Sequence, residues 1–255
     1  MTSPSEPEPT IVHAPHEPLA AYYRTEAERA GFLREIFDGT AADYDRVERY
    51  LALGSGPWYR RQALLRAGLA RGMRVVDVGF GTGLVAQQAI RIVGDAALLT
   101  GVDPSPSMMG ASPLAARVKL MEGGAEAIPL PGASADFISM GYALRHIGDL
   151  AAACAEFRRV LRPGGRLCLL EITKPRGPIG TALLKAYMRG WVPLVARLSG
   201  SQAHTPRIWR YYWDSIEACA PPERILDTLR AAGLAGVRRH VELGVFSEYQ
   251  AQRPA

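Results

Sequence analysis

The sequence predicts an α/β fold, a mostly parallel sheet of seven strands with helices on both faces, preceded by an N-terminal helical extension. Three observations support this prediction. Short β-branched runs alternate with amphipathic helical patterns from about residue 71 onward, as in a parallel sheet. A glycine-rich turn follows the first of these runs. Apolar residues make up 48% and charged residues 22%, the balance of a globular chain, and 255 residues are enough for one large domain.

The N-terminal part differs from the rest in composition. Residues 1–18 are rich in Pro, Glu and Ser and cannot bury enough apolar surface to order themselves, so we expect a disordered tail. They lack the basic and apolar regions of a signal peptide. Residues 19–70 carry apolar residues at helical spacing and are expected to form helices that act as a lid. The expected helices cover 19–37, 41–53 and 57–70, with Pro57 in a first turn.

From residue 71 onward the pattern alternates between strands and helices. Apolar and β-branched runs predict strands at 73–78, 97–102, 117–121, 135–140, 166–172, 235–242 and 244–250. Helical patterns fall at 84–93, 105–116, 149–161 and 222–232. A strong turn signal, Arg162-Pro163-Gly164-Gly165, follows the third of these helices. In such sheets a ligand binds at the carboxyl ends of the strands.

A glycine-rich loop joins the first strand to the first helix of the sheet. Gly79, Gly81 and Gly83 allow a tight turn and a close approach of a ligand to the backbone. Asp103 ends the second strand, where a carboxylate can accept hydrogen bonds from both hydroxyls of a ribose. The dinucleotide fingerprint would need a glycine at Leu84, and no Gly-Lys-Ser/Thr follows to form a P-loop. A nicotinamide enzyme, or a glycine turn without a ligand, stays open as an alternative.

An acidic residue two positions before GxGxG, here Asp77, is typical of the class I methyltransferases that use S-adenosylmethionine. The chain also resembles the C-methyltransferases of ubiquinone and menaquinone biosynthesis from about Ile36 to Gly244. The matching segments are Phe37–Asp45, Gly101–Asp103, Ser107–Met109, Gly124–Leu130, Gly141–Ile147, Arg159–Arg166, Leu170–Pro175 and Tyr212–Ile216. The Leu-Arg-x and Leu-Glu-x-x-Lys-Pro pieces are the more family-specific, whereas the cofactor motifs are shared by many methyltransferases.

The resemblance implies a Rossmann-like class I methyltransferase fold over residues 71–255, with S-adenosylmethionine as the cofactor. It implies methyl transfer to a ring carbon of a quinol or related aromatic, with a small aromatic or prenylated molecule as substrate. The residues expected to bind the cofactor are Asp77, Gly79, Gly81, Gly83, Asp103, Met108, Ala125, Glu126 and Tyr142. We expect Asp77 to contact the methionyl ammonium. Because Gly124 stands where the family has Asp or Asn, we expect the Ala125 amide to recognise the adenine edge.

Three residues are candidates for the chemistry at the methyl acceptor. A ring carbon becomes nucleophilic when the adjacent phenol loses its proton, so a cation and a base are expected near that oxygen. Arg145 can stabilise the phenolate because it stays charged. His146 stands where the family has Asn and can take the proton, since its pKa lies near neutrality. The resemblance adds Tyr44 as a partner in proton removal.

Structural alternatives to these three roles stay open. Arg145 can simply pair with a carboxylate such as Asp149. His146 can be a capping or solvated residue, and Tyr44 can be a core or lid aromatic. Two further carboxylates, Asp136 and Glu171, are expected to be structural.

One stretch is unusual in its charge. No Asp or Glu occurs from residue 172 to 213, while seven cations and three of the four tryptophans fall there. We expect a lid insertion or pocket wall at 175–215, and Pro193 should kink or end any helix within it. Residues 175–213 can alternatively contact a membrane surface. A nucleic-acid partner is not expected, because no base-reading motif accompanies the cations.

The remaining features narrow the class of protein. The three cysteines have no metal-ligand spacing and are expected to be buried hydrophobes: Cys154, Cys168 and Cys219. The sequence contains no run of 18 apolar residues that would predict a membrane span. We expect a cytoplasmic protein or one at the inner face of a membrane. A homodimer is left open. Two rival functions stay open: N- or O-methylation of a lipid amine or secondary metabolite, and cofactor binding without catalysis. His146 and the altered tail Phe246–Gln250 keep the first rival open.

Overall fold

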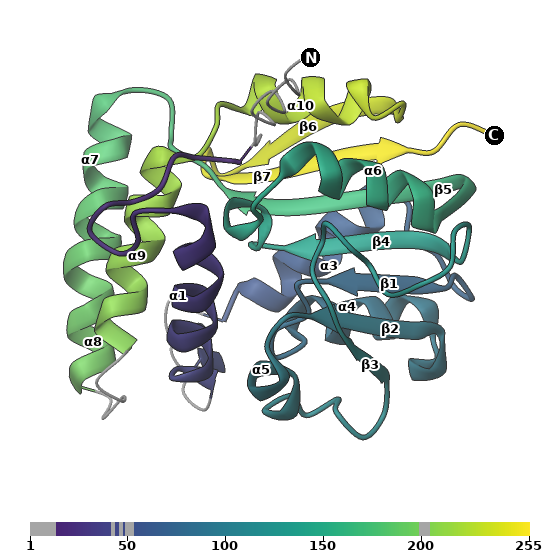
Figure 1. Cartoon of the computed structure of the whole chain (residues 1–255), viewed down its shortest axis with the longest axis horizontal. Coiled ribbons are helices and arrows are strands. Elements are labelled where there is room, and N and C mark those ends of the chain that lie inside the picture. The colour runs from purple at the N-terminus through teal and green to yellow at the C-terminus, as the bar shows by residue number, and fades with distance from the viewer. Residues whose placement is uncertain (1–13, 42–43, 46–47, 49–53, 199–204) are drawn as a thin grey trace, which may run out of the picture.

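The computed structural model describes residues 14–41, 44–45, 48, 54–198 and 205–255. At its centre lies a seven-stranded sheet in the order β3-β2-β1-β4-β5-β7-β6 (Figure 1). The strands are β1 Val75–Val78, β2 Leu99–Asp103, β3 Lys119–Glu122, β4 Ala135–Gly141, β5 Leu161–Ile172, β6 Ala235–Glu242 and β7 Phe246–Gln252. Strands β3, β2, β1, β4 and β5 are parallel, and β7 is antiparallel to both of its neighbours. The predicted mostly parallel sheet is confirmed.

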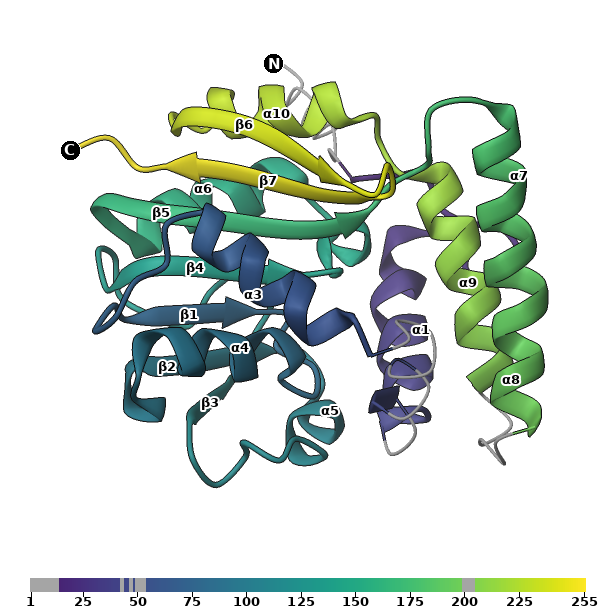
Figure 2. The ribbon, with the colours of Figure 1, turned by 180° about the vertical axis from the view of Figure 1, so that it is seen from behind.

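Helices cover both faces of the sheet, as predicted. Helices α3 (Gly56–Arg66) and α4 (Leu84–Val93) lie on one face, and α6 (Leu150–Val160) and α10 (Pro222–Ala231) lie on the other (Figures 1 and 2). Each face has its own buried apolar cluster. On the α6 side Phe157, Leu167 and Leu229 are fully buried, and on the α4 side Ala86 and Phe137 are fully buried. Burial on both faces explains why the central strands are almost continuously apolar.

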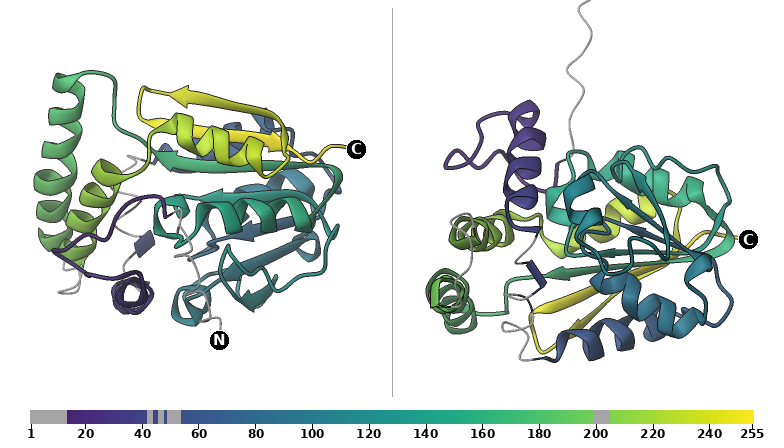
Figure 3. Two further views of the ribbon diagram at one scale, coloured as in Figure 1. Left: turned by 45° about the horizontal axis from the view of Figure 1, so that its top comes forward. Right: turned by 90° about the horizontal axis from the view of Figure 1, so that it is seen from below.

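A third layer stands beyond the carboxyl ends of the parallel strands. It consists of α1 (Glu26–Asp38), α9 (Thr205–Ala218) and a long rod made of α7, a π-turn and α8 (Figures 2 and 3). The parts of the rod are α7 Pro178–Ala186, the π-turn Tyr187–Trp191 and α8 Val192–Leu198. An aromatic cluster that includes Phe32, Trp209 and Trp213 holds these helices together. This layer faces the edge at which ligands bind in such sheets.

Two local predictions differ from the structure. The helix expected at 105–116 is only α5, Pro106–Gly110, because Pro113 disfavours helical backbone at the preceding residue and the Ser112 hydroxyl accepts from the Leu114 amide instead. The turn expected at Arg162–Gly165 is part of β5, although its register is irregular. The reason is tertiary pairing: the Gly164 amide donates to the Arg253 carbonyl, and the Arg253 amide donates to the Gly165 carbonyl.

The segments outside the sheet also depart from the predictions. Residues 14–18, expected to belong to the tail, pack on the fold: His16 is buried, and the Ala220 amide donates to the Pro15 carbonyl over 2.6 Å. The rest of the predicted tail, and most of the helix expected at 41–53, lie outside the described residues. The rod continues past Pro193, because the π-turn just before it widens the helix where the proline lacks an amide.

Candidate active site

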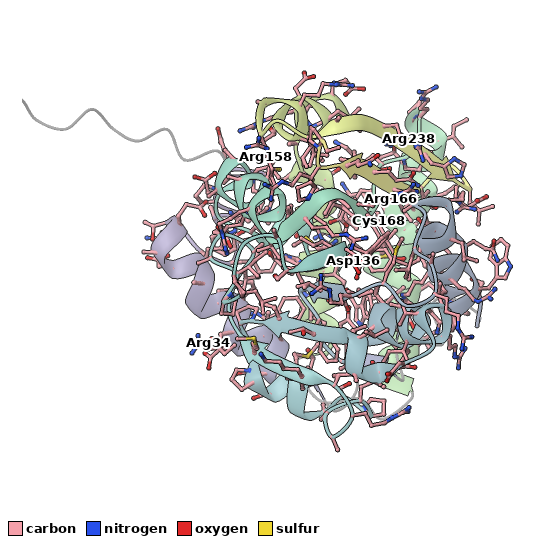
Figure 4. All side chains as sticks on the ribbon, turned by 90° about the vertical axis from the view of Figure 1, so that its right-hand side faces the viewer. Arg34, Asp136, Arg158, Arg166, Cys168 and Arg238 are labelled. Atoms are coloured by element: carbon pink, nitrogen blue, oxygen red, sulfur yellow. The ribbon has the colours of Figure 1, made fainter. Side chains whose placement is uncertain are left out.

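A cavity of about 410 Å³ lies between the carboxyl edge of the sheet and the third layer. The loops that follow β1, β2 and β4 form one side of it, and α1 and Tyr212 of α9 form the other. Its volume is in the range of small-molecule sites. Figure 4 looks onto the opposite edge, where Asp136 lies and accepts from the Arg74 amide over 2.8 Å. Asp136 therefore has a structural role, as expected. The candidate binding and catalytic residues lie at the cavity instead.

The glycine-rich loop forms the floor of the cavity. Gly79 and Gly81 line it and have φ of +68° and +56°, the left-handed region that favours glycine. A Cβ atom on Gly79 would lie 2.6 Å from the Cβ of Ala143, so the backbone there has no room for a side chain. Gly83 does not line the cavity; it is the N-cap of α4, with φ +84°. The loop therefore presents bare backbone to a ligand.

Asp103 lines the cavity at the end of β2. Its carboxylate accepts from the Gly81 amide over 2.7 Å and from the Ser105 amide over 2.8 Å, which fixes its orientation toward the loop. Burial raises the pKa of Asp103 to about 6, although both amides oppose the shift. An ionised carboxylate has about four lone-pair sites, so two remain for hydroxyl donors of a ligand.

Asp77 is not among the residues that line the cavity, and its contact with the methionyl ammonium, directly or through a water, stays a prediction. It lies under the loop, 1% exposed, and accepts from the Ser139 hydroxyl over 2.6 Å. Burial raises its pKa to about 7. Its other carboxylate oxygen, Oδ2, is buried without a hydrogen-bond partner. Asp77 therefore supports the loop from beneath it.

The loop after β3 forms the far wall. Ala125 and Glu126 line the cavity together with Met108 of α5. The Glu126 carboxylate accepts from the Gly148 amide over 2.6 Å, so it joins this loop to the one that follows β4. Glu126 thus shapes the wall, while the backbone at Ala125 remains available to a flat heterocycle.

Tyrosines and a histidine enclose the other end of the cavity. Tyr44, Tyr142, His146 and Tyr212 all line it, and the Tyr212 hydroxyl donates to the Tyr44 hydroxyl over 3.1 Å. Tyr142 has φ +60°, a rare conformation for a residue with a side chain. Burial raises the pKa values of Tyr44 and Tyr212 above their usual range. We call this aromatic region the acceptor end of the cavity.

His146 is the titratable group of the acceptor end with a free ring nitrogen. Its Nδ1 lies 3.0 Å from the Tyr211 hydroxyl, while Nε2 is buried without a hydrogen-bond partner. Burial, reinforced by the positive charge of Arg145, holds the pKa of His146 well below its usual value. The pKa is therefore not near neutrality, contrary to the expectation from the sequence, because burial disfavours the charged ring. The ring is neutral at physiological pH, and Nε2 can accept a hydrogen bond from a ligand.

Arg145 lies behind the wall of the cavity rather than in it. It is 1% exposed and forms an ion pair with the buried Glu171, not with Asp149. Its guanidinium also donates to the Ser215 hydroxyl over 3.1 Å and lies 4.8 Å from the ring centroid of Tyr212. Arg145 therefore reaches the acceptor end through a tyrosine.

The residues of the cavity that were not predicted from the sequence include a buried cation. Arg60 of α3 lines the cavity, is 3% exposed, and pairs with Glu48 while its guanidinium lies 5.5 Å from the Tyr142 ring centroid. A buried cation at this position suits an anionic group of a ligand. No local motif marks Arg60, because an arginine in an amphipathic helix usually faces solvent.

The model of the ubiE/COQ5 methyltransferase family matches residues 24–251 of the chain. The chain belongs to this family. A ubiquinone/menaquinone biosynthesis C-methyltransferase of Hahella chejuensis is 30% identical, over 81% of this chain and 85% of the relative. A demethylmenaquinone methyltransferase of Mycolicibacterium paratuberculosis is 31% identical, over 86% of this chain and 93% of the relative.

Solved structures agree on the fold of this family member. A methyltransferase of Thermotoga maritima, described as S-adenosylmethionine-dependent, superposes with a TM-score of 0.61 and 20% identity over 87% of this chain and 99% of that one. An S-adenosylmethionine-dependent methyltransferase of Aquifex aeolicus superposes with a TM-score of 0.58 and 20% identity, over 82% of this chain and 97% of that one. The predicted Rossmann-like methyltransferase fold is confirmed. The chain is an S-adenosylmethionine-dependent methyltransferase of the ubiE/COQ5 family, as the resemblance implied.

The cavity fits this cofactor. The bare backbone at Gly79 and Gly81, the oriented Asp103 carboxylate and the buried Arg60 offer complementary groups for a nucleoside that carries an amino acid. Seven of the nine residues expected to bind the cofactor line the cavity, and Asp77 and Gly83 support the loop from outside it. Of the three expected catalytic residues, Tyr44 and His146 line the cavity and Arg145 does not.

Proposed function

We propose that this methyltransferase methylates a ring carbon of a quinol or related aromatic molecule and releases S-adenosylhomocysteine. The observation that carries the proposal is the acceptor end, where aromatic side chains surround the unpartnered Nε2 of His146. Flat aromatic acceptors stack on such walls, and a ring hydroxyl can bond to the free nitrogen. The printed names of the two relatives, which refer to C-methylation and to demethylmenaquinone, support the same class of acceptor.

The cofactor residues divide the work of binding. Asp103 accepts hydrogen bonds from the ribose hydroxyls, and the backbone at Ala125 meets the adenine edge. The backbone at Gly79 and Gly81 would hold the methionyl part of the cofactor, and the charge of the nearby Arg60 would suit a carboxylate. Much of the rate gain in methyl transfer comes from such alignment of donor and acceptor.

The chemistry begins with the acceptor hydroxyl. S-Adenosylmethionine supplies a methyl group on a positively charged sulfur, which is a good leaving group. With Nδ1–H donating to Tyr211, Nε2 of the neutral His146 can accept the hydroxyl proton. Held by Asp103, Gly79 and Gly81, the cofactor would supply its methyl group to the adjacent ring carbon. The ring hydrogen would leave as a proton and restore the hydroxyl group, and His146 would return its proton to solvent.

Arg145 is a positioning residue in this proposal. Its charge lies close to the Tyr212 ring and lowers the pKa values of Tyr44 and Tyr212 against the effect of burial. Because the Tyr212 hydroxyl donates to the Tyr44 hydroxyl, Tyr44 is the group that donates to a phenolate oxygen, and Tyr212 strengthens that donor. The cation stabilises the developing charge through two hydroxyl groups rather than by direct contact.

The second candidate is O- or N-methylation of another acceptor on the same scaffold. The observation that favours it is His146 itself, since a neutral imidazole can equally deprotonate the oxygen or nitrogen that receives the methyl group. The cytoplasmic or membrane-peripheral location and the homodimer remain predictions.

The test is incubation of the protein with methyl-labelled S-adenosylmethionine and a naphthoquinol, which dithionite produces from the naphthoquinone. A catechol and a primary amine are added as competing acceptors. Tandem mass spectrometry then locates the label. We expect label on a ring carbon of the quinol. Label found only on oxygen or nitrogen would replace this proposal with the second candidate, and cofactor binding without label on any of the three compounds would show that the acceptor belongs to another class.

Two histidine variants separate chemistry from folding. His146→Ala should lower kcat by about 10²–10⁴, the usual contribution of a general base, while cofactor affinity stays the same. His240→Ala, in the 46%-exposed histidine of β6, is the matched control and should leave both quantities unchanged. Equal kcat in the two variants would remove His146 from the mechanism.

A further inference from the structure

The rod formed by α7, the π-turn and α8 has two apolar faces. One packs against α9, and the other is exposed to solvent. Leu184, Met188 and Val192 point toward α9 and are half-buried or buried. A helix at the surface of a soluble domain usually carries polar residues on its outer face. The rod does not follow this rule, so its outer face needs an explanation.

Large hydrophobic side chains recur along the outer face of the rod. Ile179, Leu183, Trp191 and Leu194 are 76%, 68%, 59% and 48% exposed. Their separations of four, eight and three residues keep them on one side of a helix. Contiguous exposed apolar residues of this kind mark interaction sites, whereas scattered ones do not.

The charged side chains of the rod and its flanks are all positive. The sequence has no acidic residue between Glu171 and Asp214, and Arg176 and Arg197 are exposed at the two ends of the rod. Lys185 and Arg189 lie along its side, where they pair with Glu217 and Asp214 of α9. The outer face is thus an apolar strip with positive charge at both ends.

A cation-flanked apolar strip is complementary to an anionic lipid surface. Self-association through a two-fold axis would bring Arg176 and Arg197 near the same cations of a second copy, with no acid of the rod to pair with them. We propose that the outer face of the rod lies in the headgroup region of an anionic bilayer. Its apolar residues enter the acyl boundary, Trp191 sits at headgroup level, and the arginines meet lipid phosphates.

The docking surface is the rod alone, a smaller region than the whole acid-free stretch. Helix α9 contributes to the packed interior instead, since Trp209 and Trp213 are 4% and 0% exposed. It lies between the rod and the sheet (Figure 2) and supplies Tyr212 to the acceptor end. A bilayer on the rod is therefore one helix away from the aromatic wall. Among the described residues, no helix is long and apolar enough to cross a membrane, so this contact is peripheral.

The experiment is co-sedimentation of the full chain with two kinds of vesicle, pure phosphatidylcholine and phosphatidylcholine with about 30% phosphatidylglycerol. Each is measured at about 0.05 and 0.5 M NaCl. We expect binding to the anionic vesicles that weakens with salt. The double variant Ile179→Glu/Leu183→Glu should bind at least about tenfold more weakly, because it loses two inserted side chains. Leu65→Glu, at a 39%-exposed leucine of α3, is the matched control and should bind like the parent protein.

Cofactor titration and thermal unfolding show whether each variant is folded, and neither requires the methyl acceptor to be known. Sedimentation velocity gives the oligomeric state of all three proteins. Absence of vesicle binding by the parent protein, or equal binding by the double variant, overturns the proposal. A double variant that changes from dimer to monomer and keeps its lipid affinity would assign the face to a second copy instead. These outcomes are independent of whether quinols are methylated.

Discussion

Replacing Glu171 by Gln tests the role of Arg145 behind the cavity wall. The side chains of Arg145 and Glu171 are 1% and 0% exposed, so the substitution leaves a buried guanidinium without its counter-charge. Breaking such a pair from one side costs about 3–5 kcal/mol. Arg145 keeps hydrogen bonds to the Ser215 hydroxyl and the Tyr142 carbonyl, which places the cost near the lower limit. At roughly 2–4 °C per kcal/mol for a domain of this size, Tm should fall by about 6–12 °C.

The double variant Arg145→Met/Glu171→Leu separates stability from catalysis. Replacing both charges by apolar groups of similar volume is often neutral or stabilising, so its free energy of unfolding should lie within about 1 kcal/mol of the parent value. Its kcat should nevertheless be lower than that of the parent protein, because Tyr212 no longer has a cation 4.8 Å from its ring. Cofactor affinity should be unchanged, since Arg145 does not line the cavity.

Urea unfolding and initial rates of methyl transfer, measured on the parent, the single variant and the double variant, decide the matter. A double variant that regains both stability and full kcat would show that Arg145 only holds the fold together. A wild-type Tm in the single variant would contradict the buried ion pair itself.

Three further predictions concern the cavity. Because the pKa of Asp103 is raised to about 6, its carboxylate loses charge as pH falls from 7 to 5, and S-adenosylmethionine affinity measured by calorimetry should fall with it, a dependence that Asp103→Asn abolishes. Gly79→Ala should weaken cofactor binding at least about tenfold, since its Cβ would lie 2.6 Å from that of Ala143, whereas Gly110→Ala meets nothing within 4 Å and should bind normally. The pKa of His146 is lower in the folded than in the unfolded chain, so the unfolded chain binds its proton first below about pH 6.5 and the free energy of unfolding should decline there; His146→Asn should reduce that decline in urea titrations at pH 7 and 5.5.

The cofactor end of the site was predictable because its determinants are local. The glycines that need positive φ stand next to the strand that positions them, and Asp103 ends the neighbouring parallel strand. Parallel strands place their carboxyl ends at one edge, so the sequence order alone brings these residues together. Asp77 differs in that its carboxylate is buried under the loop, where it accepts from the Ser139 hydroxyl of the neighbouring strand β4.

The acceptor end was only partly predictable, because neighbouring residues there point in opposite directions. Leu144–His146 form a single 3-10 turn, in which His146 faces the cavity and Arg145 faces the interior. The ion-pair partner of Arg145 is Glu171, at the end of β5. Asp149, which the sequence offered as an alternative partner of Arg145, instead caps α6 by accepting from the amides of Ala151 and Ala152. Side-chain direction in a short turn depends on what packs around it, which one sequence does not reveal.

The two ends of the cavity share the loop after β4 but differ in their other parts, and this difference has a consequence for specificity. That loop supplies Tyr142 and His146 to the acceptor end, α9 adds Tyr212, and α1 also lines the cavity. Those helices belong to the aromatic cluster that also holds Met188 and Val192 of the rod. A substitution in that cluster, such as one at the fully buried Trp213, should therefore alter the choice of acceptor and the seating of the rod together while cofactor affinity stays constant. The same packing that encloses the aromatic ring thus ties the proposed lipid-facing helix to the chemistry.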